Sequence, residues 1–370
     1  MRRIPSLDGL RAVAISLVCL SHLSYLKDHP THDFSSLGPL GVRIFFVISG
    51  MLITRLLLEE REHSGGVSLK GFYIRRTVRI FPAMWFYVAV MAALSAAGVI
   101  ALHHHDILHA LTYTINYFPE RSWYLGHIWS LSVEEQFYLL WPLVLCFAPP
   151  RWGIRAALVA ICLAPLLRLG MLFVSTQTPY FEWFPTTCDS IAMGCLLSLL
   201  PPDGRWKRLA ARIAAARWFI VVPTLVFVVN LLRRHAEGRL MVSEKNRLAF
   251  MFLDTVGTIM MNGGIALTIL HVTNYPRDIF GRILNAPPVV WLGKISYSLY
   301  LWQMPFLNHD ASSWITRTPV NLVASVCAAC FSYYLIENPL QRLRKRLGWG
   351  GERRSKAADP LAAVATEAVS

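Results

Sequence analysis

Ten apolar segments recur along the chain, and they constrain its fold more than any other feature of the sequence. A helix needs about 20 largely apolar residues to cross a bilayer, with a lower limit of roughly 17. The segment 186–201 needs flanking residues to complete a crossing. Because 55% of the residues are hydrophobic and only 16% are charged, we predict an all-α integral membrane protein with about ten transmembrane helices. The segments are 10–26, 40–58, 80–102, 131–148, 155–174, 186–201, 217–232, 250–272, 289–307 and 315–336.

The distribution of lysine and arginine predicts the orientation of these helices. With the N-terminus inside and ten crossings, most of the basic residues fall in inner loops and in the tail, which is the bias of cytoplasmic loops. We therefore expect both termini in the cytoplasm, although the basic outer segment 233–247 is an exception. The net charge of +14 is then explained by topology and by contact with the lipid bilayer. No nucleic-acid partner is needed to account for it.

The rest of the chain predicts a simple domain organisation. Residues 1–345 form one transmembrane domain, and 346–370 form a basic cytoplasmic tail whose composition is typical of disorder. The segment 106–118 is too short to span and is expected to be re-entrant or interfacial. The histidine tract 103–105 is interpreted as a solvated cluster, so no metal site is expected. The sequence leaves a homo-oligomer open.

The first apolar segment carries a polar stripe. Asp8, Arg11 and His22 lie along one face if the segment is helical. At about 1.5 Å per residue, His22 lies roughly 16 Å beyond Arg11, in or past the middle of the bilayer. Asp8 and Arg11 are expected to pair near the cytoplasmic surface. His22 can be a hydrogen-bonded interior histidine or a general base, since neutral imidazole accepts a proton near pH 7.

Three arginines stand close together at the inner end of the third segment: Arg75, Arg76 and Arg79. Anchoring by positive charge at the cytoplasmic surface explains a single arginine well. Three of them beside Lys70 also form a fork suited to phosphate or pyrophosphate. From the residues alone, both interpretations stay open.

Two adjacent glutamates, Glu134 and Glu135, stand at the start of the fourth segment, in HIWSLSVEEQFYLLW. Carboxylates early in a helix suit the positive end of its dipole, which accounts for one of the two. His127, Ser130 and Glu134 share a helix face, and Glu135 points about 100° away from it. We therefore expect Glu134 to face a cavity that also holds His22, and Glu135 to face protein or the outer interface.

Seven stretches together carry a family resemblance. They resemble the acyltransferase 3 family of membrane-bound O-acyltransferases, from residue 4 to about residue 345, in the stand-alone form without a C-terminal esterase-like domain. The resemblance implies ten spans in a bacterial cytoplasmic (inner) membrane. It also implies transfer of an acyl group, usually acetyl, from cytoplasmic acyl-CoA to a hydroxyl of a glycan, lipo-oligosaccharide or glycoside acceptor. The stretches are LDGLRAVAISLVCLSH, GVRIFFVISGMLIT, FYIRRTVRIFP, HIWSLSVEEQFYLLWP, CDSIAMGCLL, LGKISYSLYLWQMP and YLIENPLQRL.

The resemblance also suggests roles for single residues. His22 would take the proton of the acceptor hydroxyl, and Glu134 would orient or stabilise its imidazolium; an acyl-histidine intermediate stays open. Acyl-CoA, usually acetyl-CoA, is a substrate, so no permanently bound cofactor is expected. The expected roles are catalysis for His22, Glu134 and Ser132, donor binding for Arg75, Arg76 and Arg79, and support for Asp8, Arg11, Glu135, Asp189 and Tyr297.

Two positions depart from the family pattern, and two other classes of protein compete with it. Arg43 stands where an aspartate is common, and Gln303 stands where LYLWH would place a histidine. A proton-coupled transporter using buried His, Asp, Glu and Arg residues predicts internal repeats and broken helices, and the sequence shows neither. A lipid- or glycan-binding protein without catalysis would not require His22.

Overall fold

The computed structural model describes residues 5–23, 34, 37–171, 182–201, 204–216, 244–308, 311 and 313–348, without the side chains of residues 5 and 244–254. Every element among these residues is helical. The expected segment 217–232 and residues 349–370 of the expected tail lie outside the described residues.

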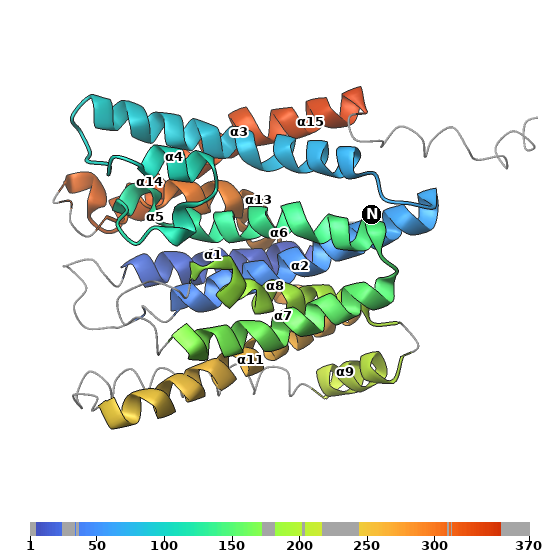
Figure 1. Cartoon of the computed structure of the whole chain (residues 1–370). Coiled ribbons are helices and arrows are strands. Elements are labelled where there is room, and N and C mark those ends of the chain that lie inside the picture. Colours follow the sequence, from blue (N-terminus) through green and yellow to red (C-terminus); the bar gives the residue numbers. More distant parts are fainter. Residues whose placement is uncertain are drawn as a thin grey trace, which may run out of the picture.

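Long helices run side by side and form the body of the molecule (Figure 1). Short helices cover its two ends or connect the long ones. The long helices are α1 (Pro5–Leu23), α2 (Leu37–Ser64), α3 (Leu69–Ala96), α6 (Ile128–Phe147), α7 (Pro150–Met171), α8 (Phe184–Leu199), α11 (Glu244–Asn274), α13 (Pro287–Trp302) and α14 (Val320–Ser332). The short ones are α4 (Asp106–Leu111), η1 (Ile115–Tyr117), α5 (Trp123–Gly126), α9 (Arg205–Ala215), α12 (Ile279–Leu284), η3 (Trp314–Thr316), the π-helix η4 (Tyr333–Glu337) and α15 (Asn338–Leu347).

Six stretches of the described helices are long and apolar enough to cross a membrane, which confirms an all-helical membrane protein. The expected segments 131–148, 186–201 and 289–307 form α6, α8 and α13, which have 20, 16 and 16 residues. The total of about ten spans stays a prediction. The six stretches are Ser6–Leu23, Leu37–Ser64, Leu69–Ala96, Pro150–Met171, Thr255–Asn274 and Val320–Leu347.

The third helix differs in its bounds from the predicted segment 80–102. It begins at Leu69, because the Ser68 hydroxyl accepts a hydrogen bond from the Gly71 amide at 3.1 Å and caps its N-terminus. It ends at Ala96. The arginines near its start therefore lie inside a regular helix, roughly two to three turns from the cap.

The short segment 106–118 forms α4 and η1, which lie over the end of the bundle opposite the N-terminus (Figure 1). Its contact with α6 is polar. The Gln136 amide donates to the Tyr113 carbonyl oxygen at 2.8 Å and to the Asn116 side-chain oxygen at 3.0 Å. Six-residue and three-residue helices cannot cross the bilayer, so this segment covers one end of the bundle.

Glycine allows two pairs of helices to approach closely. A Cβ atom at Gly50 of α2 would lie 1.9 Å from the Ile191 carbonyl oxygen of α8, and one at Gly194 would lie 2.0 Å from the Val47 carbonyl oxygen. At the contact of α1 with α13, a Cβ atom at Gly293 would lie 1.8 Å from a carbonyl oxygen of α1. Small residues at such crossings are typical of membrane helices. These contacts hold α2 against α8, and α1 against α13.

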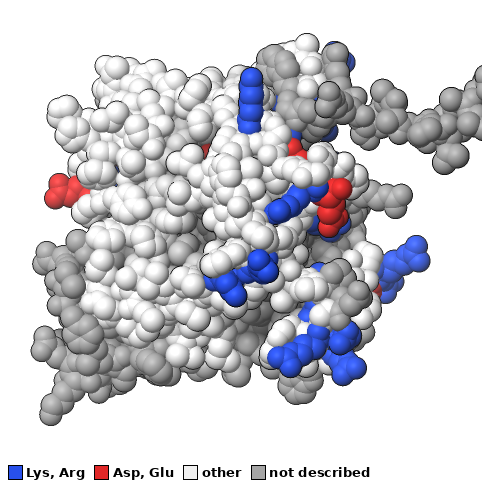
Figure 2. All heavy atoms as spheres, turned by 45° about the vertical axis from the view of Figure 1, so that its right-hand side comes forward, with Lys and Arg blue, Asp and Glu red and all other residues white. Residues whose placement is uncertain are grey.

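Charge is distributed unevenly over the surface. Figure 2 shows Lys and Arg side chains gathered on the part of the bundle that forms the right-hand end of Figure 1, while the described residues seen on the opposite part of this face are mostly uncharged. The first helix begins and α15 ends at that same end (Figure 1). We call it the basic end. The positive-inside bias predicts that it faces the cytoplasm.

Candidate active site

Two cavities lie inside the bundle. The first has a volume of about 390 Å³, and we call it the arginine cavity. It is bordered by α1, α2, α3, α6 and α13, with η4 and α15 toward the basic end. The second has a volume of about 570 Å³, and we call it the histidine cavity. The residues that matter below are Arg11, Arg76, Arg79, Glu134, Glu135 and Glu337 in the first cavity, and His22, Arg43, Arg121, Trp123, His127 and Glu182 in the second.

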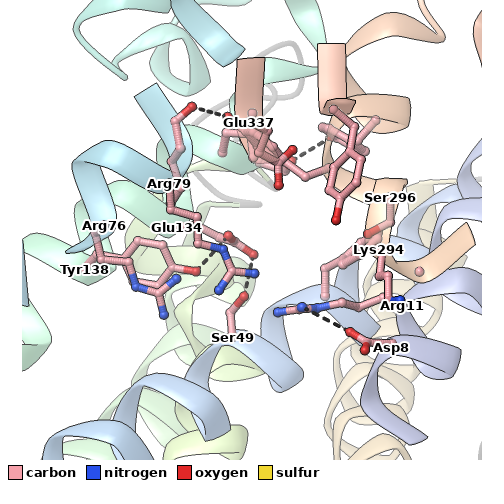
Figure 3. Close-up of a pocket in the computed structure, with 18 of the residues that line it drawn as sticks. Asp8, Arg11, Ser49, Arg76, Arg79, Glu134, Tyr138, Lys294, Ser296 and Glu337 are labelled. Carbon is pink, nitrogen blue, oxygen red and sulfur yellow. Dashed lines mark hydrogen bonds and ion pairs between the residues drawn. The ribbon is translucent and has the colours of Figure 1, made fainter. Parts of the chain in front are cut away.

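Cationic side chains enter the arginine cavity from opposite sides (Figure 3). Arg76 and Arg79 come from α3, and Arg11 comes from α1. The Arg11 guanidinium lies 3.9 Å from the Asp8 carboxylate, the pair that the sequence predicted. The Arg76 guanidinium lies over the Tyr138 ring, 4.7 Å from its centre, in a cation–π contact. Arginines from two helices thus border one space that an anion of more than one phosphate could occupy.

Glu134 is held firmly in the arginine cavity. Ser49 donates to one carboxylate oxygen and Tyr138 to the other, each at 2.9 Å. Glu135 lines the same cavity, and its Oε1 is buried without a hydrogen-bond partner among the described residues. The prediction that only Glu134 faces a cavity is therefore wrong. The cavity extends around α6 far enough to include two side chains about 100° apart.

Arg75 does not belong to the arginine cavity. Its guanidinium pairs with the Glu60 carboxylate of α2 at 2.6 Å, and its carbonyl oxygen accepts from Arg344 at 3.2 Å. Successive residues of a helix point about 100° apart, so adjacency to Arg76 does not imply a shared direction. The structure thus brings Arg76 and Arg79 together with Arg11, and places Arg75 elsewhere.

His22 lines the histidine cavity. Its Nδ1 lies 3.3 Å from the side-chain oxygen of Gln303, and its ring meets Trp123 edge-on with centroids 5.6 Å apart. Gln303 is fully buried, so the residue at the position that departs from the family pattern contacts the imidazole directly. A second imidazole, that of His127, is buried in the same cavity, and neither of its nitrogens has a hydrogen-bond partner within the described parts of the chain.

The structure separates residues that the sequence placed together. Glu134 and His22 line different cavities, so the prediction that Glu134 points into the cavity of His22 is wrong. Each residue lies on the inward face of its own helix, but the two lie at different depths in the bundle. Ser132 lines neither cavity; it is fully buried, and its hydroxyl donates to the Ile128 carbonyl oxygen at 3.1 Å. The catalytic role expected for Ser132 stays a prediction.

Two tyrosines of α13 complete the polar lining. Tyr297 lines the arginine cavity and donates to the Ile80 carbonyl oxygen of α3 at 2.8 Å, so it supports the site. The Tyr300 hydroxyl lies 2.7 Å from the Ser130 hydroxyl and donates to the His127 carbonyl oxygen at 2.9 Å. Tyr300 borders both cavities. No pattern in the sequence singled it out, because its importance depends on where α13 meets α6.

Asp189 lines neither cavity, but it belongs to a buried hydrogen-bond network that reaches the histidine cavity. Its carboxylate pairs with Arg168 at 2.8 Å, and both side chains are buried. It also accepts from Asn262 at 3.3 Å. Asn262 in turn accepts from Ser190 at 3.0 Å, and Ser190 accepts from Arg43 of the histidine cavity at 3.1 Å. The buried charges are thus compensated by a connected network, as buried ion pairs require.

The histidine cavity also contains an ion pair between two loops, the one before α5 and the one before α8, which we call the covering loops. Arg121 pairs with Glu182, and both line the cavity. Burial raises the pKa of Glu182 above its ordinary value, and the Arg121 charge acts in the opposite direction. Among the described residues, no group of three or more His, Cys, Asp and Glu side chains is arranged to hold a metal ion. The polar lining of this cavity therefore includes the two imidazoles, Arg43 and the Arg121–Glu182 ion pair.

Comparison with known proteins identifies the family. A family model described as an acyltransferase domain matches residues 4–337. The chain is 28% identical to O-acetyltransferase OatA of Staphylococcus aureus (strain NCTC 8325 / PS 47), over 92% of this chain and 58% of that protein. It is 30% identical to the putative O-acetyltransferase SACOL0978 of Staphylococcus aureus (strain COL), over 94% of this chain and 59% of that protein. The chain therefore spans less than two thirds of the length of these relatives. No solved structure matches it.

Proposed function

The chain belongs to the acyltransferase 3 family, and we propose that it transfers an acyl group, most simply acetyl, from acyl-CoA to a hydroxyl of a glycan or glycolipid. The arrangement of the two cavities carries this proposal. The arginine cavity lies toward the basic end, where a cytoplasmic anionic donor would enter, and the histidine cavity lies toward the covering loops. Relatives that are named O-acetyltransferases support the acetyl group and the oxygen acceptor.

The donor would bind through its phosphates. Arg11, Arg76 and Arg79 border the arginine cavity from two sides. Guanidinium groups form charge-assisted, bidentate hydrogen bonds with phosphate oxygens, and they keep their charge in a buried site. Arg76 is pre-positioned by its contact with the Tyr138 ring. With the phosphates held there, the uncharged arm of the donor extends toward the histidine cavity.

The acceptor would react in the histidine cavity. His22 removes the proton of the acceptor hydroxyl, and the oxygen attacks the thioester carbonyl carbon. The carbon–sulfur bond then breaks, the acyl group stays on the oxygen, and the CoA thiolate leaves and takes up the proton from the imidazolium. Gln303 is the polar side chain that contacts the His22 ring. Glu134 accepts from Ser49 and Tyr138 in the other cavity, so its proposed role shifts from orienting His22 to ordering the donor site.

The experiment that tests this proposal uses the full chain in membrane vesicles of defined orientation. Acetyl-CoA is supplied at one face and a polysaccharide or glycoside with free hydroxyls at the other, and both thiol release and the acetyl mass increment on the acceptor are measured. We expect both signals only when acetyl-CoA is present at the basic end. Proton movement across the vesicle membrane without thiol release would favour a transporter. Binding of acceptor without thiol release would favour a non-catalytic protein.

A further inference from the structure

Three residues border both cavities: Val42 and Phe46 of α2, and Tyr300 of α13. Of the described residues that line either cavity, these alone line both. The two cavities therefore meet at these three side chains, which we call the wall. A group that passes from one cavity to the other passes the wall.

The wall is apolar on the side of α2 and rigid on the side of α13. Val42 and Phe46 stand one turn apart on the same face of α2, and the Phe46 ring meets Trp129 edge-on with centroids 6.2 Å apart. Tyr300 is anchored, because its hydroxyl bonds with Ser130 and with the His127 carbonyl oxygen. All three wall residues are more than nine-tenths buried. Hydrocarbon surface of this kind suits an acyl chain, and it disfavours a phosphate or a hydrated sugar.

The charged groups and the imidazole lie in different cavities, far apart along α1. On α1, Arg11 lines the arginine cavity and His22 lines the histidine cavity. The two residues are 11 positions apart, which is roughly 16 Å along a helix. Because the two described cavities share only the wall residues, we infer that the acyl end of a donor held by the arginines passes the wall on its way to His22.

On the basis of the proposed function, we propose that the wall formed by Val42, Phe46 and Tyr300 determines which acyl chains are transferred. Side chains of this volume admit a short acyl group and exclude a long one. Discrimination by a hydrophobic pocket amounts to about tenfold or more per methylene group. Phe46 contributes the largest movable side chain, since Tyr300 is fixed by its hydrogen bonds.

The test compares acyl-CoA donors of increasing length, from acetyl to octanoyl, with one acceptor. The wild-type chain, Phe46→Ala, Phe46→Leu and Val42→Ala are measured as ratios of kcat/KM between each longer donor and acetyl-CoA. A ratio between two donors does not depend on the fraction of protein that folds. Ile80→Ala is the matched control, because Ile80 is also buried but lines the arginine cavity alone.

We expect Phe46→Ala to raise the ratio for butyryl- or hexanoyl-CoA at least tenfold, with smaller rises for Phe46→Leu and Val42→Ala and no rise for Ile80→Ala. If the wild-type chain transfers acetyl and the wall variants keep its donor profile, or if Ile80→Ala changes the profile equally, the wall does not select the chain. If the wild-type chain consumes no acyl-CoA of any length, the proposed function fails and this inference fails with it.

Discussion

The two cavities are built largely on the same helices, yet they differ in chemistry. On α1, Arg11 belongs to the arginine cavity and His22 to the histidine cavity. On α6, Glu134 belongs to the first, and His127, at the start of that helix, belongs to the second. The arginine cavity gathers arginines and carboxylates close to the basic end, and the histidine cavity combines two imidazoles with the Arg121–Glu182 ion pair under the covering loops. In a bundle of long helices, the depth of a residue along its helix decides which site it serves, and its helical face alone does not.

This difference predicts that substitutions in the two cavities change different kinetic constants. Changes in the arginine cavity should act on the donor, and changes in the histidine cavity should act on the acceptor and on the chemical step. Each of the following experiments tests that division of effects between the two cavities.

The largest effect is expected for His22→Ala. Loss of a general base lowers the rate by about 10²-fold or more, so acyl transfer should fall to that extent while the yield of folded protein stays unchanged. The rate of acylated-acceptor formation, at equal amounts of monodisperse protein, is the measurement. His104→Ala is the control, because His104 is exposed and lines neither cavity. Near-normal transfer by His22→Ala would show that His22 is not the general base of the reaction.

Arg76→Ala should raise the KM for acetyl-CoA by about 10- to 100-fold, because a charge-assisted hydrogen bond contributes roughly 1.5–3 kcal/mol. The KM for the acceptor should not change. Arg75→Ala is the matched control, since Arg75 is adjacent in sequence but pairs with Glu60 outside the cavity. Initial-rate kinetics with each substrate varied in turn provide both constants. Equal effects of the two variants would show that the arginines act through membrane anchoring rather than through the donor.

Glu134→Gln should lower kcat/KM for the donor about tenfold. The carboxylate accepts from Ser49 and Tyr138 through different oxygens, and an amide can accept through only one of them, so one buried donor loses its partner at a cost of roughly 1–3 kcal/mol. Glu135→Gln should have a smaller effect, because Glu135 Oε1 makes no hydrogen bond among the described residues.

The pH dependence of turnover distinguishes the new role of Glu134 from the one expected from the sequence. A carboxylate in contact with His22 would raise the pKa of the imidazole, and its removal would shift the pH profile to lower values. Because the two residues line different cavities, we expect the profile of Glu134→Gln to overlay that of the wild-type chain. A shifted profile would contradict the separation of the cavities.

The smallest effect is expected for Gln303→Leu. The substitution removes the side-chain oxygen that lies near His22 Nδ1, and a neutral hydrogen bond contributes about 0.5–1.5 kcal/mol. Turnover should fall between about 2-fold and 10-fold with an unchanged KM for acetyl-CoA. Gln341→Leu is the counterpart in the arginine cavity, where Gln341 donates to Glu337, and it should act on the donor instead. A change in the KM for acetyl-CoA caused by Gln303→Leu would contradict the assignment of donor binding to the arginine cavity alone.

The sequence predicted the helical membrane fold and several of the residues in the cavities, because apolar length and helical periodicity are local properties. Arg11, Arg76 and Glu134 do line a cavity, as does His22. Arg75 could not be distinguished from Arg76 in this way. Its partner, Glu60, lies on another helix, and which neighbour a side chain meets depends on how the helices pack.

The depth of the α6 residues relative to His22 was the other property that the sequence did not predict. The stripe of His127, Ser130 and Glu134 was correctly placed on the inward face of α6, yet it runs past the wall and serves both cavities. Tyr300 was missed for a related reason, because its role depends on how two helices pack. Its role arises where α13 meets α6, and neither the periodicity of α13 nor its composition contains that contact.

The apolar wall has a further consequence for the membrane in which the chain lies. Protons move quickly along chains of hydrogen-bonded water, and the two polar cavities can hold such chains on either side of the wall. Val42 and Phe46 give water no partner, and the Tyr300 hydroxyl is already committed to Ser130 and the His127 carbonyl oxygen. Hydrophobic constrictions of this kind exclude water. We therefore expect the three wall side chains to limit the passage of water between the cavities, and so to keep the ion gradient from discharging through the bundle.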